Sequence, residues 1–297
     1  MIACPDPFER APRAAGSEPP AQWLRLAPPS LQGALVALLG RDTRHLPLHS
    51  AQRLTHFPAS PMVTISWFRG IDVGVIEQGI WQPFGAQVVI SGSASDPRVS
   101  WAPTTGCGYV ACFNAGAAHA LFGVDLTAIQ DRFVPVEQVI GKQFAPLWAA
   151  LLASDDAALM AVLEAHLAPR WQTLQGRDAA PGLRQLGRHW VERLAWQAHQ
   201  WRNLHSSRQV ERRIKAFSGR SMREWQSLVR TEGLFFAGRD LHDAGQPFDW
   251  AAMAQDEGFS DQAHMSRTVK RITGFSPGEF SQRFVDDESF WMYRLWV

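Results

Sequence analysis

The feature that most constrains this 297-residue chain is a pattern that occurs twice near its C-terminus, 55 residues apart. In the later copy, Met265, Val269 and Ile272 fall at i, i+4 and i+7, which predicts a helix with one apolar face. The matched pairs at this offset are Val210 and Met265, Ile214 and Val269, Phe217 and Ile272, Arg212 and Arg267, Lys215 and Lys270, Gly219 and Gly274, Ser221 and Ser276, and Trp225 and Phe280. Eight matches at a single offset indicate a repeated structural unit.

The later copy has the composition of a helix-turn-helix. Small alanines at 251, 252 and 254 keep its first helix slim, and Gly258 suits a tight turn. Ser260 and Asp261 stand where an N-cap is expected, and Gly274 stands at the end of the second helix. The earlier copy has no glycine in its turn. Asn203 tolerates the left-handed conformation there, and a longer turn is the alternative.

A helix in the major groove reads base edges with polar side chains near its N-terminus and touches phosphates farther along. The expected base-reading residues are Ser207, Arg208, Gln209 and Arg212 in the first unit, and Gln262, His264 and Arg267 in the second. The expected phosphate contacts are Arg213, Lys215, Lys270 and Arg271, and Ser260 and Asp261 cap the second helix. For each charged residue the alternative is a solvated helix face, and Glu211 can pair with Lys215. The apolar residues of both copies are expected to form bundle cores.

Basic charge is concentrated around the first copy, although the formal net charge of the chain is only +1. Between residues 202 and 230 we count eight Lys and Arg against two Glu, an excess of six. Residues 1–180 hold 12 basic against 14 acidic residues. Positive charge placed at the predicted helix-turn-helix is what phosphate contact requires.

The segment GFSDQAHMSRTVKRITGFSPGEF closely resembles the second-unit signature of the AraC/XylS family of transcription regulators, and the likeness extends over roughly residues 182–284. The resemblance implies a C-terminal tandem helix-turn-helix domain that binds double-stranded DNA, and a cupin-like N-terminal sensor domain. It leaves open a small-molecule effector and a homodimer. The run CFNAGAAHALFGVDLTAIQDRFVPVEQVIG is similar to part of a sensor domain found in uncharacterised members, for which no ligand carries over.

The N-terminal half predicts a β-rich domain. Segments 63–68, 74–76, 87–91 and 108–113 are short and rich in β-branched and aromatic residues, which is typical of an antiparallel barrel or sandwich. Leu31, Leu35, Leu38 and Leu39 fit a short helix, and helices are expected over 136–152, 155–167 and 223–237. The expected class is therefore α+β with two domains.

We divide the chain into a disordered leader (1–20), a sensor or dimerisation domain (21–175), a linker (176–182), a DNA-binding domain (183–285) and an aromatic tail (286–297). The two helix-turn-helix units are expected at 183–225 and 247–280. The tail residues Phe290, Trp291, Tyr293 and Trp296 are expected to pack on a domain surface or on a partner, because large aromatic side chains rarely stay in water.

Other classes of function find less support. No apolar run is long enough for a membrane span, and no signal-peptide pattern is present, so we expect a cytoplasmic protein that joins the nucleoid when bound to DNA. We expect no cofactor, no metal and no catalytic residues. One alternative is a metal-binding or enzymatic barrel that uses His45, His49, His56 or His119. A second alternative is a regulator controlled by a protein partner that binds the aromatic tail.

Overall fold

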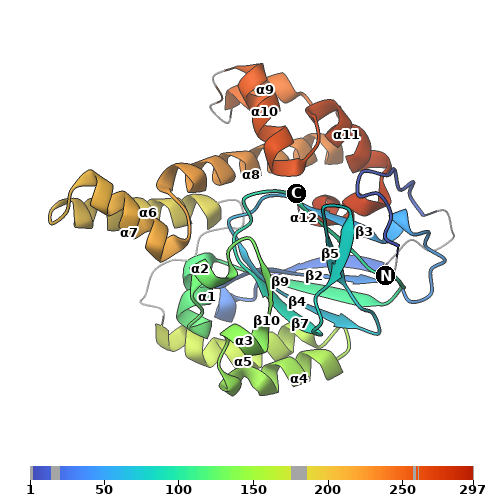
Figure 1. Ribbon diagram of the computed structural model, residues 1–297, viewed down its shortest axis with the longest axis horizontal. Helices are drawn as coiled ribbons and strands as arrows, with labels where there is room; N and C mark the ends of the chain where they lie inside the picture. The colour runs from blue at the N-terminus through green and yellow to red at the C-terminus, as the bar shows by residue number, and fades with distance from the viewer. Residues whose placement is uncertain (1–2, 15–20, 175–185, 257–258, 260, 297) are drawn as a thin grey trace.

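The computed structural model describes residues 3–14, 21–174, 186–256, 259 and 261–296. Its N-terminal part contains two antiparallel sheets with helices on one side, and its C-terminal part is helical (Figure 1). The predicted α+β class is confirmed. The expected linker at 176–182 lies outside the described residues. No helix in the described ranges is both long and apolar enough to span a membrane.

The larger sheet has six strands in the order β1-β2-β9-β4-β7-β10, and the smaller sheet has four strands in the order β3-β8-β5-β6. The first set is β1 (Ala21–Leu26), β2 (Leu35–Asp42), β9 (Cys107–Phe113), β4 (Val63–Arg69), β7 (Val88–Ser91) and β10 (Phe133–Pro135). The second set is β3 (Leu54–Phe57), β8 (Arg98–Trp101), β5 (Gly74–Glu77) and β6 (Ile80–Pro83). The strand segments predicted from the sequence are confirmed.

The helix predicted across Leu31 to Leu39 is wrong. Only Pro29–Leu31 forms a short 3-10 helix (η1), and Leu35 begins strand β2, which pairs with β1 on one side and β9 on the other. Both faces of β2 are buried, from Leu35 to Arg41. A strand buried on both faces is a continuous apolar run, so its period of two is lost and a helical spacing fits by accident.

Alternate residues of the large sheet face two different layers. Leu38, Trp67 and Tyr109 belong to the core beneath the helices, whereas Leu39 and Val110 belong to a second core on the opposite face. The covering helices are α1 (Ala115–Phe122), α2 (Leu126–Ile129), α3 (Val136–Val139), α4 (Ala145–Ala153) and α5 (Leu159–Leu174), with η3 (Lys142–Phe144) before α4. The second face is turned toward the smaller sheet and toward the C-terminal helices (Figure 1).

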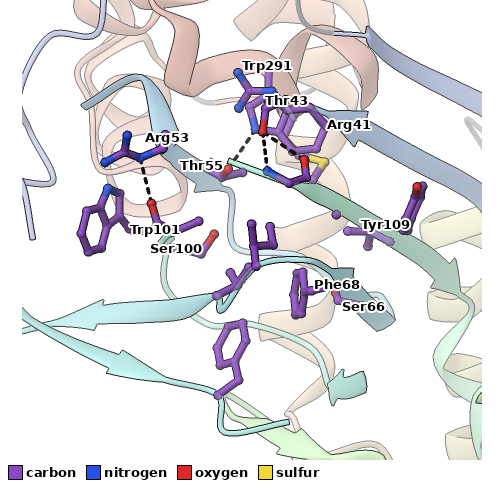
Figure 2. A pocket seen from close by; sticks show the side chains of 18 of the residues that line it. Arg41, Thr43, Arg53, Thr55, Ser66, Phe68, Ser100, Trp101, Tyr109 and Trp291 are labelled. Carbon is purple, nitrogen blue, oxygen red and sulfur yellow. Dashed lines mark hydrogen bonds between the residues drawn. The ribbon is translucent and has the colours of Figure 1, made fainter. Parts of the chain in front are cut away.

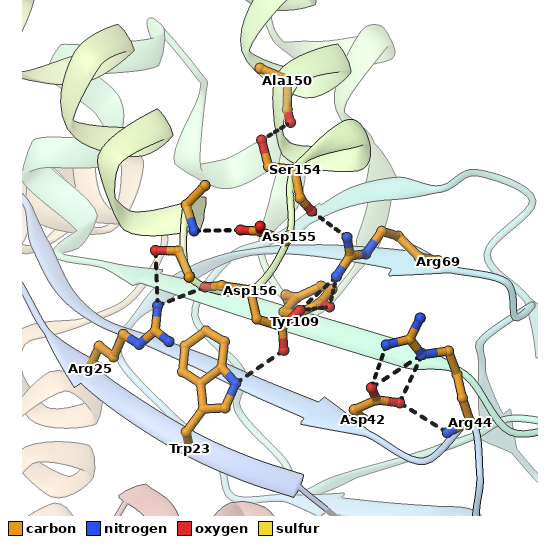
Figure 3. A network of polar contacts seen from close by, with 12 residues as sticks. Trp23, Arg25, Asp42, Arg44, Arg69, Tyr109, Ala150, Ser154, Asp155 and Asp156 are labelled. Carbon is orange, nitrogen blue, oxygen red and sulfur yellow. Dashed lines mark hydrogen bonds and ion pairs between the residues drawn. The ribbon is translucent and has the colours of Figure 1, made fainter.

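A polar network ties the helical layer to the large sheet (Figure 3). The Asp156 carboxylate, between α4 and α5, accepts hydrogen bonds from Tyr109 and Arg69 and from Trp23 Nε1, the last at 3.3 Å. Arg25 donates to the Asp156 carbonyl at 2.7 Å and stacks on the Trp23 ring. Strands β1, β4 and β9 are thereby joined to one carboxylate, which fixes the helices over this face.

The C-terminal region is a chain of helices. They are α6 (Leu186–Arg202), α7 (Ser207–Ser218), α8 (Met222–Asp243), α9 (Trp250–Asp256), α10 (Gln262–Thr273), α11 (Pro277–Asp286), η5 (Glu288–Phe290) and α12 (Trp291–Trp296). Helix α8 is the predicted connecting helix, and α7 and α10 lie toward its opposite ends (Figure 1). Gly233 does not interrupt α8.

The prediction of a disordered leader is wrong for residues 3–14. Ala11 is buried, Pro12 forms a β-bridge with Asp287, and Arg283 donates to the Phe8 carbonyl at 2.5 Å. The segment has little apolar surface, but its backbone carbonyls accept hydrogen bonds from residues that follow the second helix-turn-helix. Residues 15–20 lie outside the described part of the chain.

The aromatic tail packs on the N-terminal domain, which confirms the prediction for Phe290, Trp291 and Tyr293, all of them buried. Trp291 Nε1 donates to Thr55 Oγ1 in β3 at 2.9 Å, and the Phe290 ring lies 5.2 Å from that of His56. The side chain of Trp296 lies outside the described set. The end of the C-terminal helical region is thus part of the core of the N-terminal domain.

Candidate nucleic-acid interface

The 55-residue repeat is confirmed at the level of single residues. Helices α7 and α10 have 12 residues each and begin at 207 and 262, which preserves the offset. Gly219 and Gly274 end them in the left-handed conformation, with φ of 82° and 85°. Only glycine adopts this conformation at little cost, so the glycine itself determines where each helix ends.

The turn of the first unit forms without a glycine. Four residues separate α6 from α7, and five separate α9 from α10, so the first turn is not the longer one. Among the non-glycine residues that the structure describes, positive φ occurs at Gln78 and Asp131, so Asn203 does not take the left-handed conformation considered for it. The amides of Leu204 and His205 instead donate to the Trp201 carbonyl.

The predicted bundle cores are confirmed with one exception. Met265, Val269 and Ile272 are fully buried, as are Val210 and Ile214. The prediction is wrong for Phe217, whose side chain is 44% exposed. Its ring lies 6.2 Å from that of His119 in α1, so this side chain faces the N-terminal domain instead of its own bundle.

Most of the predicted DNA-facing residues are exposed to solvent. The exposed set comprises Ser207, Arg208, Gln209, Arg212, Arg213, Lys215, Asp261, Gln262, Arg267, Lys270 and Arg271. His264 is half-buried, with its ring 5.4 Å from that of Phe259. Ser260 lies outside the described residues. Asp261 caps α10, as predicted, by accepting from the His264 amide at 2.6 Å.

Three of these side chains are held by contacts within the chain. Gln209 Oε1 accepts from the Ser206 amide at 2.9 Å, so part of this side chain serves as a helix cap. The Arg213 guanidinium lies 5.8 Å from the centre of the Trp201 ring. Arg271 donates to Ser227 in α8 at 2.5 Å and so links the two units.

The residue after each C-terminal glycine anchors its unit to the N-terminal domain. In the first unit this residue is Arg220, which is only 2% exposed. Its Nε donates to Ser93 Oγ at 3.0 Å, and its Nη2 lies 3.3 Å from Asp131 Oδ1. Burial alone would raise the pKa of Asp131, but hydrogen bonds from Ser95 and the charge of Arg220 outweigh burial, and the pKa falls below its ordinary value.

The equivalent residue of the second unit is Phe275, 55 positions later. Its ring lies 5.2 Å from that of His56 and 5.3 Å from that of Phe290. Burial lowers the pKa of His56 to about 3, so this imidazole is neutral and belongs to an apolar contact. Neither anchor was predicted. The sequence contains one sign of these contacts: at the 55-residue offset a charged residue, Arg220, is matched with Phe275.

The smaller sheet and the inner face of the large sheet enclose a cavity of about 90 Å³ (Figure 2). Apolar and aromatic side chains dominate its wall, which contains Phe57, Phe68, Phe84, Trp101, Phe133, Trp291 and Met292. Two guanidinium groups, those of Arg41 and Arg53, also line it. Neither arginine was predicted to line a cavity, because the wall is assembled from strands of both sheets and from the C-terminal residues Trp291 and Met292, which are far apart in the chain.

The histidines proposed for a metal-binding barrel have other surroundings. His56 is buried among aromatic rings, and His119 Nδ1 lies 2.9 Å from the Val124 carbonyl. Within the described ranges, no three His, Cys, Asp or Glu side chains gather as a metal site would require. None of the three cysteines forms a disulfide.

No protein-family model matches the chain, and no curated protein matches it. Solved structures of ToxT from Vibrio cholerae are similar to it. An apo ToxT variant is 13% identical with a TM-score of 0.44, covering 87% of this chain and 99% of that one. ToxT bound to (E)-4-(8-methylnaphthalen-1-yl)but-3-enoic acid is 10% identical with a TM-score of 0.37, covering 89% and 97%. These TM-scores lie below 0.5, so the likeness to ToxT carries no conclusion about function.

Proposed function

We propose that this chain is a sequence-specific DNA-binding transcription regulator of the AraC/XylS type. The observation that carries the proposal is the pair of 12-residue helices, α7 and α10, related by the 55-residue repeat and both exposing polar and basic side chains. Helices of this kind read the major groove when they follow a short turn. Two of them at opposite ends of α8 would enter adjacent turns of one duplex face, roughly 10 bp apart.

Base reading would fall mainly to exposed side chains in the first half of each helix. Arg208, Arg212 and Arg267 can each pair with guanine through two hydrogen bonds, and Gln262 can pair with adenine, each worth roughly 1–3 kcal/mol of discrimination. Because the His264 side chain is half-buried, it would extend less far into the groove than the exposed side chains of Gln262 and Arg267. Lys270, one turn farther along α10, is suited to phosphate contact. The proposal assigns no catalytic residue and no cofactor.

The sensor domain would control the two helices through their anchors. Arg220 and Phe275 connect the units to the N-terminal domain at equivalent positions, so a change in that domain reaches both reading helices. The cavity between the sheets supports a small-molecule signal. Formation of a homodimer or binding of a protein partner are the alternatives for the control of DNA binding. A protein with this role would be found in the cytoplasm, and in the nucleoid when it is bound to DNA.

A binding-site selection with the full chain, followed by two matched variants, tests the proposal. Arg267→Ala removes a base-reading side chain and should cost about 1–3 kcal/mol at one base pair while relaxing the preference there. Lys270→Ala, on the same helix, should weaken binding to all sequences and reduce the salt slope by about one. If no sequence is enriched, or if Arg267→Ala leaves affinity and preference unchanged, the assignment of α10 as a reading helix is wrong.

A further inference from the structure

One loop of the N-terminal domain lies against the C-terminal ends of both proposed reading helices. Residues 93–97, between β7 and β8, form this loop, which we call the bridging loop. A second segment lies beside it, because Ser60 and Ala94 form a β-bridge with N–H···O distances of 3.1 Å and 2.9 Å. The two segments make one continuous surface, and both units of the 55-residue repeat end on it.

The first unit meets this surface through Arg220, the residue after the glycine that ends α7. Its Nη2 donates to the Ser93 carbonyl at 2.9 Å, and its Nη1 donates to Ser95 Oγ at 2.5 Å. Asp131 holds the loop from the other side, because its carboxylate accepts from Ser95 Oγ at 2.8 Å. The φ of Asp131 is 56°, a strained conformation for a residue other than glycine. These contacts give the end of α7 one fixed position.

The second unit meets the same surface through its backbone. The carbonyl of Ile272, in the last turn of α10, accepts from the Ala59 amide at 2.9 Å. Carbonyls in the last turn of a helix have no partner within that helix, so the N-terminal domain supplies one. Pro97 lies so close to the glycine at 274 that a Cβ there would be 3.6 Å from its Cγ. Equivalent turns of the two units therefore end on the bridging loop and the segment beside it.

Helix α8 by itself joins the two units through a single helix that can bend. It contains Gly233 and Gly238, and glycine inside a helix restrains the backbone less than alanine does. The hydrogen bond between Arg271 and Ser227 also joins the units, but it is exposed, so water competes for both partners. The bridging loop adds a second connection with buried contacts. Helix α8 and the N-terminal domain thus hold α7 and α10 from two sides.

We propose that the bridging loop sets the distance and the rotation between α7 and α10, and thereby makes the chain select one spacing between two DNA half-sites. A rigid connection favours joint binding at one spacing, whereas a loose connection tolerates several. One inserted base pair moves the second half-site by about 3.4 Å and turns it by about 34°. Selection of DNA spacing rests on the proposed function, whereas the fixed distance between the helices does not.

The distance between the helices is measured on the full chain without DNA, by double electron–electron resonance between two spin labels. Labels at Glu211→Cys and Ala263→Cys occupy exposed positions of α7 and α10. Cys4 is replaced by serine, and the other two cysteines are buried. The labelled chain should give one narrow distance distribution, and adding Arg220→Met should widen it at least about twofold. An unchanged width would overturn the inference.

The spacing preference is measured on the unlabelled chain, with duplexes that carry the two selected half-sites and have one or two base pairs inserted or removed between them. The wild type should lose at least about tenfold in affinity for each base pair. Arg220→Met should reduce that loss to about threefold, and should weaken the best site by less than about tenfold. Equal spacing profiles would overturn the inference. So would tighter binding of Arg220→Met at every spacing, which would mean that the loop holds the helices away from DNA.

Two further variants distinguish positioning of the helices from a general loss of stability. Ser93→Ala removes one acceptor of Arg220 but keeps the attraction for Asp131, so it should shift both measurements in the same direction by a smaller amount. Tyr109→Phe is the control, because it removes a buried hydrogen bond to Asp156 beneath the covering helices, far from the bridging loop in the sheet. Tyr109→Phe should keep the narrow distance distribution and the wild-type spacing profile. A distribution as wide as that of Arg220→Met would overturn the role of the loop.

The two measurements also separate this inference from the proposed function. A chain whose distance distribution widens in Arg220→Met, but which enriches no DNA sequence, supports positioning by the bridging loop and overturns the regulator assignment. A chain that selects paired half-sites, but shows the same spacing profile in Arg220→Met, overturns the inference and leaves the regulator assignment in place.

Discussion

The two helix-turn-helix units share one backbone plan but attach to the N-terminal domain through opposite chemistry, one by a charged side chain and the other by an aromatic ring. In both, a buried hydroxyl (Ser218 or Thr273) donates to the carbonyl four residues earlier, and the next residue is a left-handed glycine. The following side chain is a buried arginine in the first unit and a buried phenylalanine in the second. The repeated residues therefore give both units the same helix ends and turns. The contact with the N-terminal domain depends on the one position after the glycine, which is Arg220 in the first unit and Phe275 in the second.

The apolar anchor should be the stronger of the two. Phe275→Ala removes a fully buried ring between His56 and Phe290 and should lower the free energy of unfolding by about 3–5 kcal/mol. Phe217→Ala is the matched control in the first unit, because that ring is largely exposed and should cost less than about 1 kcal/mol. Urea unfolding of both variants makes the comparison, and similar losses would contradict it.

The polar anchor should have a smaller, pH-dependent effect. Arg220→Met keeps the volume but loses the hydrogen bonds to Ser93 and the attraction for Asp131, at a cost of about 1–3 kcal/mol. Because the folded-state pKa of Asp131 is lowered, the stability it contributes is complete above its unfolded pKa of about 3.9 and is lost as pH falls through the folded pKa.

The acid-induced loss of stability should accordingly be shallower in Arg220→Met than in the wild type. Unfolding followed between neutral and acidic pH measures this slope. Arg212→Met replaces an exposed basic residue of α7; it is the control and should change stability by no more than about 0.5 kcal/mol. If stability falls equally steeply with pH in the wild type and in Arg220→Met, the lowered pKa of Asp131 does not depend on Arg220.

The smallest difference in stability between the two units is expected when their C-terminal glycines, Gly219 and Gly274, are replaced. Gly219→Ala and Gly274→Ala each place a side chain at positive φ, which should cost about 1 kcal/mol. A Cβ at position 219 would also meet the Gln130 side chain, whereas at position 274 the nearest atom is Pro97 Cγ at 3.6 Å. Gln130 is flexible and can move, so Gly219→Ala should exceed Gly274→Ala by only a few tenths of a kcal/mol in thermal unfolding. A larger loss of stability for Gly274→Ala than for Gly219→Ala would contradict the expected effect of the Gln130 contact.

Local chemistry explains which features the sequence could predict. The ends of α7 and α10 depend on caps, glycine stops and apolar spacing within 12 residues, and these were predicted correctly. The exception, Phe217, packs against a residue of the other domain. Strand β2 was predicted as a helix, because burial on both faces removes the alternation that identifies a strand.

The missed features depend on contacts between distant segments. Arg220 and Ser93 are 127 positions apart, and Arg41 and Glu288 are 247 apart. Neither pair has a local signature, because an arginine in a strand or after a helix has many alternative partners. The tertiary fold alone brings each pair together, so neither pair could be inferred from spacing.

The contact between residues 3–14 and the helices that follow the second unit has a consequence for synthesis on the ribosome. Pro12 pairs with Asp287, and Arg41 in β2 pairs with Glu288. At about 5–20 residues added per second, the first strands wait many seconds for these partners. A product cut short before residue 287 would lack Glu288, Trp291 and Met292, which would leave Arg41 without its carboxylate and the apolar face around Leu39 and Val110 uncovered. Such products should stay open to proteases, so the fold distinguishes chains that contain residues 287–292 from chains that lack them.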